Sequence, residues 1–146
     1  MNWLNRYADP VYCIVRIVIG LLFACHGTTK IFGFQPSRYG PAHNPLGLTA
    51  GWIEMVGGLL IAFGFLTRLA AFICSGEMAV AYFMTSVAGR PFDHAPTIME
   101  RLLPITNGGE FAVVLCFVFF FMVFYGPGRW SIDFLLKNSA RPEAGT

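Results

Sequence analysis

The chain has 146 residues, of which 55% are hydrophobic, only 12% are charged and fifteen are phenylalanine. Roughly a quarter of the residues in soluble globular proteins are charged, so this composition excludes an ordinary soluble domain. The formal net charge of +2 is too small to indicate a nucleic-acid partner. At this length we expect a single domain, residues 1–146, and an integral membrane protein of the all-α class.

Four runs are long and apolar enough to cross a bilayer, which needs about 20 mainly apolar residues per helix. They cover residues 11–32, 46–66, 69–87 and 109–125. The sequence therefore predicts a multi-pass bundle of four transmembrane helices. The opening segment MNWLNRYADP lacks the basic start of a cleavable signal peptide, so we expect the first span to remain in the protein.

Basic residues beside the spans indicate the orientation in the membrane. With four spans, both chain ends lie on one side, together with the short turn between the second and third spans. That side carries Arg6, Arg68, Arg129, Lys137 and Arg141, and the other side carries Lys30, Arg38, Arg90 and Arg101. The small excess favours both termini in the cytoplasm.

Six ionisable side chains fall within or at the ends of the predicted spans. They are Arg16, His26 and Lys30 in the first span, Glu54 in the second, Glu77 in the third and Glu110 at the start of the fourth. Such groups are costly in hydrocarbon, so they usually face the bundle interior and pair with one another. Glycine and alanine recur beside them at three- or four-residue spacing, which predicts close helix packing on the same faces.

The depth of these residues predicts a polar pocket in the outer half of the bundle. His26, Lys30 and Glu54 lie there, as does Glu110 in the TNGGE motif, where Asn107 can cap the start of the fourth helix. We expect Glu54 to pair with Lys30 or His26, and the pocket to serve a ligand or protons. A purely structural use of the charges, to set helix register, stays open at this point.

Arg16 lies in the inner half, where its long side chain predicts an ion pair with Glu77. A backbone carbonyl or an inner-side acid, Asp133 or Asp9, is the alternative acceptor. Either arrangement would turn Arg16 towards the inside of the bundle.

Other motifs indicate structure more than chemistry. Cys13, Cys25, Cys74 and Cys116 form no C-x-x-C pair, so we expect no metal site and no redox-active disulfide. The connection at residues 33–45 is rich in proline and glycine and predicts an ordered loop. TIMERLL at 97–103 predicts a short interfacial helix, and GPGRWSID at 126–133 ends the fourth span and starts an amphipathic segment.

The ordered set of motifs resembles the DoxX family over nearly the whole chain. It consists of HGTTKIFG after Arg16, WIEMVGG with GFLTR, NGGE, and GPGRWSID. The resemblance implies a small four-helix membrane protein of bacteria and archaea, and we expect this chain in the bacterial inner membrane. Its relatives include subunits linked to thiosulfate:quinone oxidation and to thiol and oxidative-stress defence. The residues that match the family pattern are Arg16, His26, Gly27, Lys30, Glu54, Gly58, Asn107, Gly108, Glu110 and Asp133.

Three functions fit these observations. The first is an accessory or anchor subunit of a membrane-bound redox complex, linked to quinones or thiols, with a quinone or a lipid held non-covalently in the pocket. The second is a purely structural subunit that docks a larger assembly, and the third is a small transporter or channel. The sequence has no haem, iron–sulfur or dinucleotide motif, so we do not expect catalysis by this chain alone. The expected partners are the lipid bilayer and other membrane subunits or further copies of the chain.

Overall fold

The computed structural model describes residues 2–33, 44–89 and 91–139, and within these ranges every regular element is a helix. The elements in chain order are η1 (Asn2–Leu4), α1 (Asn5–Phe32), α2 (Pro45–Phe63), α3 (Thr67–Ala81), the π-helix η2 (Tyr82–Val87), α4 (Ile98–Leu102), α5 (Pro104–Asn107), α6 (Glu110–Tyr125) and α7 (Ile132–Ser139). The fold is therefore the predicted all-α membrane bundle.

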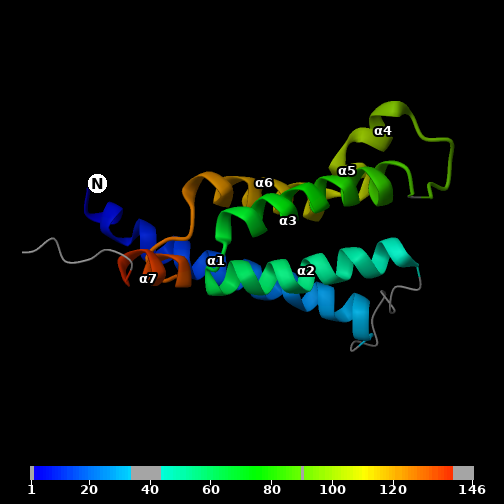
Figure 1. Cartoon of the computed structure of the whole chain (residues 1–146). Helices are drawn as coiled ribbons and strands as arrows, with labels where there is room; N and C mark the ends of the chain where they lie inside the picture. The colour runs from blue at the N-terminus through cyan, green and yellow to red at the C-terminus, as the bar shows by residue number, and fades with distance from the viewer. Residues whose placement is uncertain (1, 34–43, 90, 140–146) are drawn as a thin grey trace, which may run out of the picture.

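The four long helices form two layers (Figure 1). Helices α1 and α2 pack as one antiparallel pair and α3 and α6 as the other, and α2 also packs against α3. The N-terminus and α7 lie at one end of the bundle, here called the terminal end. Helices α4 and α5 lie at the opposite, distal end, with the C-terminal end of α1 and the start of α2.

Three helical segments have the length and hydropathy of a membrane span: Asn5–Phe32, Pro45–Phe63 and Thr67–Val87. The first begins six residues before the predicted span, because the helix continues through Pro10 into polar sequence. The fourth predicted span corresponds to α6, which is apolar but has only 16 residues. At 1.5 Å per residue it is about 24 Å long, less than the roughly 30 Å of a hydrocarbon core.

Glycine lets the backbones of α1 and α2 touch. A Cβ atom added at Gly20 would lie 2.6 Å from the carbonyl oxygen of Gly58, and one at Gly58 would lie 2.5 Å from the amide nitrogen of Ala24. A Cβ atom added at Gly27 would lie even closer to the carbonyl oxygen of Gly51. Small residues at this spacing are a main source of helix association when lipid is as apolar as leucine. The predicted small-residue stripes are thus the buried faces of this pair.

Aromatic side chains fill the space between the two layers. The rings of Phe23 and Phe119 are both buried and meet edge to face at 4.8 Å between centroids. Nearer the terminal end, Tyr12 stacks on Tyr125 at 3.9 Å and donates a hydrogen bond to the carbonyl oxygen of Gly126. These contacts join α1 to α6 and close the bundle core.

Arg16 is fully buried at the terminal end, and its partners differ from the predicted one. Its guanidinium donates to the carbonyl oxygens of Pro127 at 2.9 Å and Trp130 at 2.5 Å. The predicted ion pair with Glu77 is wrong, and the alternative of backbone acceptors is confirmed. The reason is depth: the carbonyls of the turn after α6 lie level with Arg16, whereas Glu77 lies ten residues, or about 15 Å, along α3 from Thr67.

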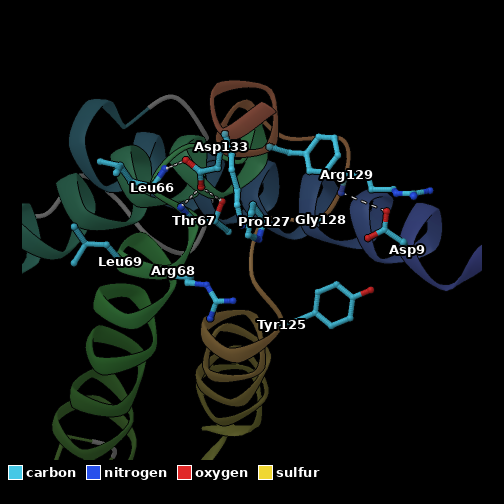
Figure 2. Close-up of a pocket in the computed structure, with 12 residues that line it drawn as sticks. Asp9, Leu66, Thr67, Arg68, Leu69, Tyr125, Pro127, Gly128, Arg129 and Asp133 are labelled. Atoms are coloured by element: carbon cyan, nitrogen blue, oxygen red, sulfur yellow. Dashed lines mark hydrogen bonds between the residues drawn. The ribbon is translucent and has the colours of Figure 1, made fainter. Parts of the chain in front are cut away.

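Asp133 of α7 caps the start of α3. Its carboxylate accepts hydrogen bonds from the backbone amides of Leu66 and Thr67, each at 2.9 Å (Figure 2). Its own amide donates to the carbonyl oxygen of Gly64 at 2.9 Å. The first amides of a helix lack partners within the helix, so a carboxylate there satisfies them and complements the helix dipole. The predicted amphipathic segment is present as α7, and this contact attaches it to the bundle.

The distal connection folds as the sequence predicts. Helix α4 forms within the TIMERLL motif and starts with a capping box, in which Thr97 and Glu100 bind each other's backbone amides at 3.3 and 2.8 Å. The other predicted loop, at residues 33–45, lies almost entirely outside the described residues.

Candidate functional site

A groove of about 520 Å³ opens between α2 and α3 towards the distal end. Its size lies within the range of small-molecule and cofactor sites. The residues that line it are Lys30, Asn44, Leu46, Gly47, Thr49, Ala50, Ile53, Ile73, Glu77, Val80, Ala81, Met84 and Thr85. This α2–α3 groove is mainly apolar, with a small number of polar groups on its walls.

Lys30 and Glu54 form an ion pair beside the groove. Lys30 Nζ lies 2.6 Å from Glu54 Oε1, and the Glu54 side chain is only 3% exposed, whereas that of Lys30 is 34% exposed. The prediction that Glu54 faces inwards and pairs with Lys30 or His26 is therefore confirmed, with Lys30 as the partner. The glycines of the α1–α2 contact bring the two helices close enough for this pair to form.

The second oxygen of Glu54 has no hydrogen-bond partner among the described residues, although it is buried. A buried carboxylate oxygen without a partner is costly, because it has lost its water and gained no donor. The same carboxylate holds Lys30 at the wall of the groove, where the exposed part of the ammonium can meet another acceptor.

Glu77 lines the groove from α3 and is the second unsatisfied acid. Its Oε2 is buried and has no hydrogen-bond partner among the described residues. It is close enough to Glu54 and Lys30 to interact with both charges. The ammonium of Lys30 is bonded to Glu54 alone among the described residues, so Glu77 keeps an oxygen that can accept a donor or a proton.

The helix type changes where α3 reaches the distal end of the groove. Helix α3 continues as the π-helix η2, which contributes Met84 and Thr85 to the lining. A π-helix widens the helical turn and often occurs at functional sites, because it changes the direction of the side chains that follow. Tyr82 at its start donates to the carbonyl oxygen of Leu102 at 2.5 Å, which attaches η2 to α4.

Two residues predicted for the polar pocket lie elsewhere. His26 is exposed on α1, where its ring centroid is 5.2 Å from that of Phe111 on α6. Glu110 is exposed in the first turn of α6, and among the described residues it has neither a hydrogen bond nor an ion pair. The joint pocket of both with Lys30 and Glu54 is not formed, because His26 lies on the side of α1 towards α6 and Lys30 on the side towards α2.

Asn107 is buried in the distal connection and not in the groove. Its side-chain oxygen accepts from the amide of Gly109 at 2.9 Å, and its side-chain nitrogen donates to the carbonyl oxygen of Arg101 at 2.6 Å. It also contacts the hydroxyl of Tyr82 at 3.3 Å. No described side chain caps the first turn of α6, because the bond from Asn107 ends at Gly109, the residue before this helix. The expected capping by Asn107 is therefore wrong, and its side chain instead joins α4 and η2 to the turn that precedes α6.

Sequence reasoning missed the hydroxyl groups of the groove. Thr49 and Thr85 both line it, and each hydroxyl donates to the carbonyl oxygen one turn earlier in its own helix. Their oxygens keep a free lone pair for a ligand donor. A signal was present in the four-residue spacing of Glu77, Ala81 and Thr85, which places all three on one side of the segment.

The described residues contain neither a cluster of metal-ligating side chains nor a disulfide. No group of three His, Cys, Asp or Glu side chains there lies close enough to hold a metal ion. Cys13, Cys25, Cys74 and Cys116 are all free thiols. Cys116 contacts Ser75 at 3.6 Å, a packing contact between α6 and α3.

The helical bundle and its apolar spans define an integral membrane protein, with a mainly apolar groove between two spans that carries a few charged side chains. The chain belongs to the DoxX family, whose profile matches residues 11–87. This confirms the resemblance seen in the motifs.

Three related proteins align with most of this chain. A Haemophilus influenzae protein described as uncharacterized is 40% identical over 136 residues, covering 91% of this chain and 96% of its own. The uncharacterized membrane protein Rv3486 of Mycobacterium tuberculosis is 27% identical, covering 94% and 88%. The inner membrane protein YqjF of Escherichia coli is 28% identical, covering 92% and 98%. No solved structure gives a significant match.

Proposed function

We propose that the α2–α3 groove binds the head group of a quinone and that the chain is an accessory subunit of a membrane-bound redox complex, respiratory or stress-protective. The observation that carries this proposal is the ion pair of Lys30 and Glu54 at the wall of an apolar groove that Glu77, whose Oε2 is buried without a partner among the described residues, also lines. An apolar groove with few, convergent polar groups suits a lipid-soluble ligand with a polar head.

The chemistry assigned to these residues is binding and proton transfer. The ammonium of Lys30 would donate to a quinone carbonyl oxygen. Glu77 would give a proton to the quinone as it is reduced, or take one from the quinol as it is oxidised. Reduction of a quinone to a quinol consumes two electrons and two protons. A partner subunit that carries a redox centre supplies the electrons, and the groove handles protons.

A purely structural docking role is the second candidate, and the surface of α6 favours it. Phe117, Phe121 and Phe124 on this helix are 67%, 54% and 66% exposed. Such a surface suits lipid or the helix of another membrane subunit. We further propose a bacterial inner membrane location, in line with the inner membrane protein YqjF of Escherichia coli. The small excess of basic residues on the side of the chain ends favours both termini in the cytoplasm.

The test is quinone binding by the purified full-length protein in nanodiscs, with decylubiquinone as the probe. We expect Glu77→Gln and Lys30→Met each to weaken binding by about tenfold or more, because each removes a charge-assisted hydrogen bond. Glu110→Gln is the matched control, since this exposed acid lies at the same end of the bundle but does not line the groove.

Unchanged binding in both groove variants would contradict the proposed site. Equal losses in the Glu110→Gln control would point to a general charge effect. If none of the variants binds the quinone differently and all still copurify with the same partner subunit, the docking role is the better account.

A further inference from the structure

A second cleft, of about 620 Å³, lies at the terminal end of the bundle (Figure 2). It is separate from the α2–α3 groove and shares none of its residues. The residues that line it are Asp9, Leu66, Thr67, Arg68, Leu69, Tyr125, Pro127, Gly128, Arg129, Asp133, Phe134 and Lys137. They come from α1, α3, the end of α6 and α7, so the tertiary fold alone creates this terminal cleft.

Three cationic side chains line the terminal cleft: Arg68, Arg129 and Lys137. Among the described residues, none of them forms an ion pair, since the ion pairs there are Lys30 with Glu54 and His94 with Glu100. Arg68 reaches from α3 towards the end of α6, where it donates to the carbonyl oxygen of Val123 at 2.6 Å. Its remaining donors are available to an anion.

The two acids of the cleft are already engaged. The Asp133 carboxylate accepts from the amides of Leu66 and Thr67 and from the Thr67 hydroxyl. Asp9 accepts from the backbone amide of Arg129 at 3.3 Å. Three cations against two carboxylates leave the cleft one positive charge in excess, with the positive groups free to bind.

The surroundings of the cleft fit the membrane surface. Helix α7 presents the exposed apolar residues Leu135 and Leu136, which are 64% and 55% exposed, and Trp130 beside it is 55% exposed. Tryptophan and amphipathic helices with lysine on the polar face are typical of the level of the lipid head groups. Leu66, Leu69 and Phe134 give the cleft an apolar wall for the start of an acyl chain.

We propose that the terminal cleft binds the phosphate head group of an anionic phospholipid in the leaflet on the side of the chain termini. Arg129 and Lys137 would contact the phosphate, with Arg68 below them, and the apolar wall would receive the glycerol end of the lipid. Basic pockets at this level of a membrane protein recognise anionic head groups through charge and hydrogen bonds. Bound lipid would hold α7 against the ends of α3 and α6.

The experiment compares lipids on the delipidated full-length protein in a mild detergent. Phosphatidylglycerol, phosphatidylcholine and inorganic phosphate are added separately, and binding is measured by native mass spectrometry and by the shift in thermal unfolding. We expect binding and stabilisation by phosphatidylglycerol and neither by the zwitterionic lipid. Arg129→Gln and Lys137→Gln should each weaken binding roughly fivefold.

Arg101→Gln is the matched control, because Arg101 is an exposed arginine at the distal end. Its lipid affinity should equal that of the wild type, and folding of all variants is checked by circular dichroism. The proposal is overturned if the double variant Arg129→Gln/Lys137→Gln keeps wild-type affinity, or if Arg101→Gln loses as much. Equal stabilisation by inorganic phosphate would also overturn it, because the ligand would then be a free anion and not a lipid.

Discussion

Asp133 Oδ2 accepts two hydrogen bonds from Thr67, one from its backbone amide at 2.9 Å and one from its hydroxyl at 3.0 Å. The two residues are 66 positions apart in the chain. Through this contact α7 holds the start of α3, next to the turn in which Leu66 adopts a left-handed backbone conformation with φ 48°. A non-glycine residue in that conformation is strained, so the cap also stabilises a tight turn.

Asp133→Ala should lower the free energy of unfolding by about 1–2 kcal/mol, the usual value of a helix N-cap. Asp133→Asn should lose less, because its one amide oxygen can still accept. Thermal unfolding in detergent measures both. Asp93→Ala in the exposed distal loop is the control and should leave the midpoint unchanged. Equal stability of Asp133→Ala and wild type would show that the cap contributes nothing.

Replacing glycine by alanine should have opposite effects at the α1–α2 contact and on the open face of α3. Gly27→Ala should destabilise the bundle by about 1–3 kcal/mol, because the added Cβ would collide with the backbone of α2. Gly76→Ala should be neutral or stabilising by up to about 1 kcal/mol, because nothing lies within 4 Å of its added Cβ and alanine favours a helix. Denaturant unfolding in mixed micelles compares the two. A destabilised Gly76→Ala would contradict the assignment of the exposed face.

The ion pair predicts an asymmetric response to the loss of either charge. Lys30→Met should be the more harmful change, at about 2–3 kcal/mol, because it leaves the buried Glu54 without its cation. Glu54→Gln should cost less, since the partly exposed ammonium of Lys30 can turn towards the membrane surface. The double variant should be more stable than Lys30→Met. A double-mutant cycle on unfolding free energies measures the coupling, and a coupling near zero would rule out the pair as a stabilising contact.

Arg16→Met should destabilise the terminal end by about 1–2 kcal/mol, because two part-buried carbonyl groups lose their donor. Arg16→Lys should not restore the wild type, since one ammonium lacks the fork of the guanidinium that reaches both Pro127 and Trp130. Hydrogen exchange of α7 reports the loss locally. If exchange in α7 is unchanged in both variants, the contact does not hold this region.

The capping box of α4 predicts a pH-dependent helix. Hydrogen bonds from the Thr97 backbone and hydroxyl, with the contact to His94, lower the pKa of Glu100 below its usual value. A depressed folded-state pKa stabilises the helix above the unfolded pKa of about 4.3, and this stability is lost as the pH falls through the lower folded value. Hydrogen exchange of the α4 amides, corrected for intrinsic rates, should therefore rise in acid. Glu100→Gln should remove this dependence, and a persistent dependence in that variant would assign it to another group.

Much of the fold follows from the sequence alone. The apolar runs predict where the four long helices lie, and the glycine spacing of residues 20, 27, 51 and 58 determines which faces of α1 and α2 meet. The inward position of Glu54 follows from the same pattern, because a charge on the glycine face must lie between helices. The pattern left Lys30 and His26 open as its partner, and the structure shows Lys30. The ordered motifs also predicted the family to which the chain belongs.

The tertiary structure decided what depended on the rotation and depth of one helix relative to another. Helical periodicity places His26 and Lys30 near one face, but only the arrangement of both layers shows that they point to different neighbours. Arg16 binds two backbone carbonyl groups in a turn. Every residue has a backbone carbonyl, so the residue types alone do not identify such an acceptor. Likewise the terminal cleft gathers residues from four segments, so no local pattern could predict it. Sequence encodes faces and lengths, whereas contacts between distant segments depend on how those faces pack.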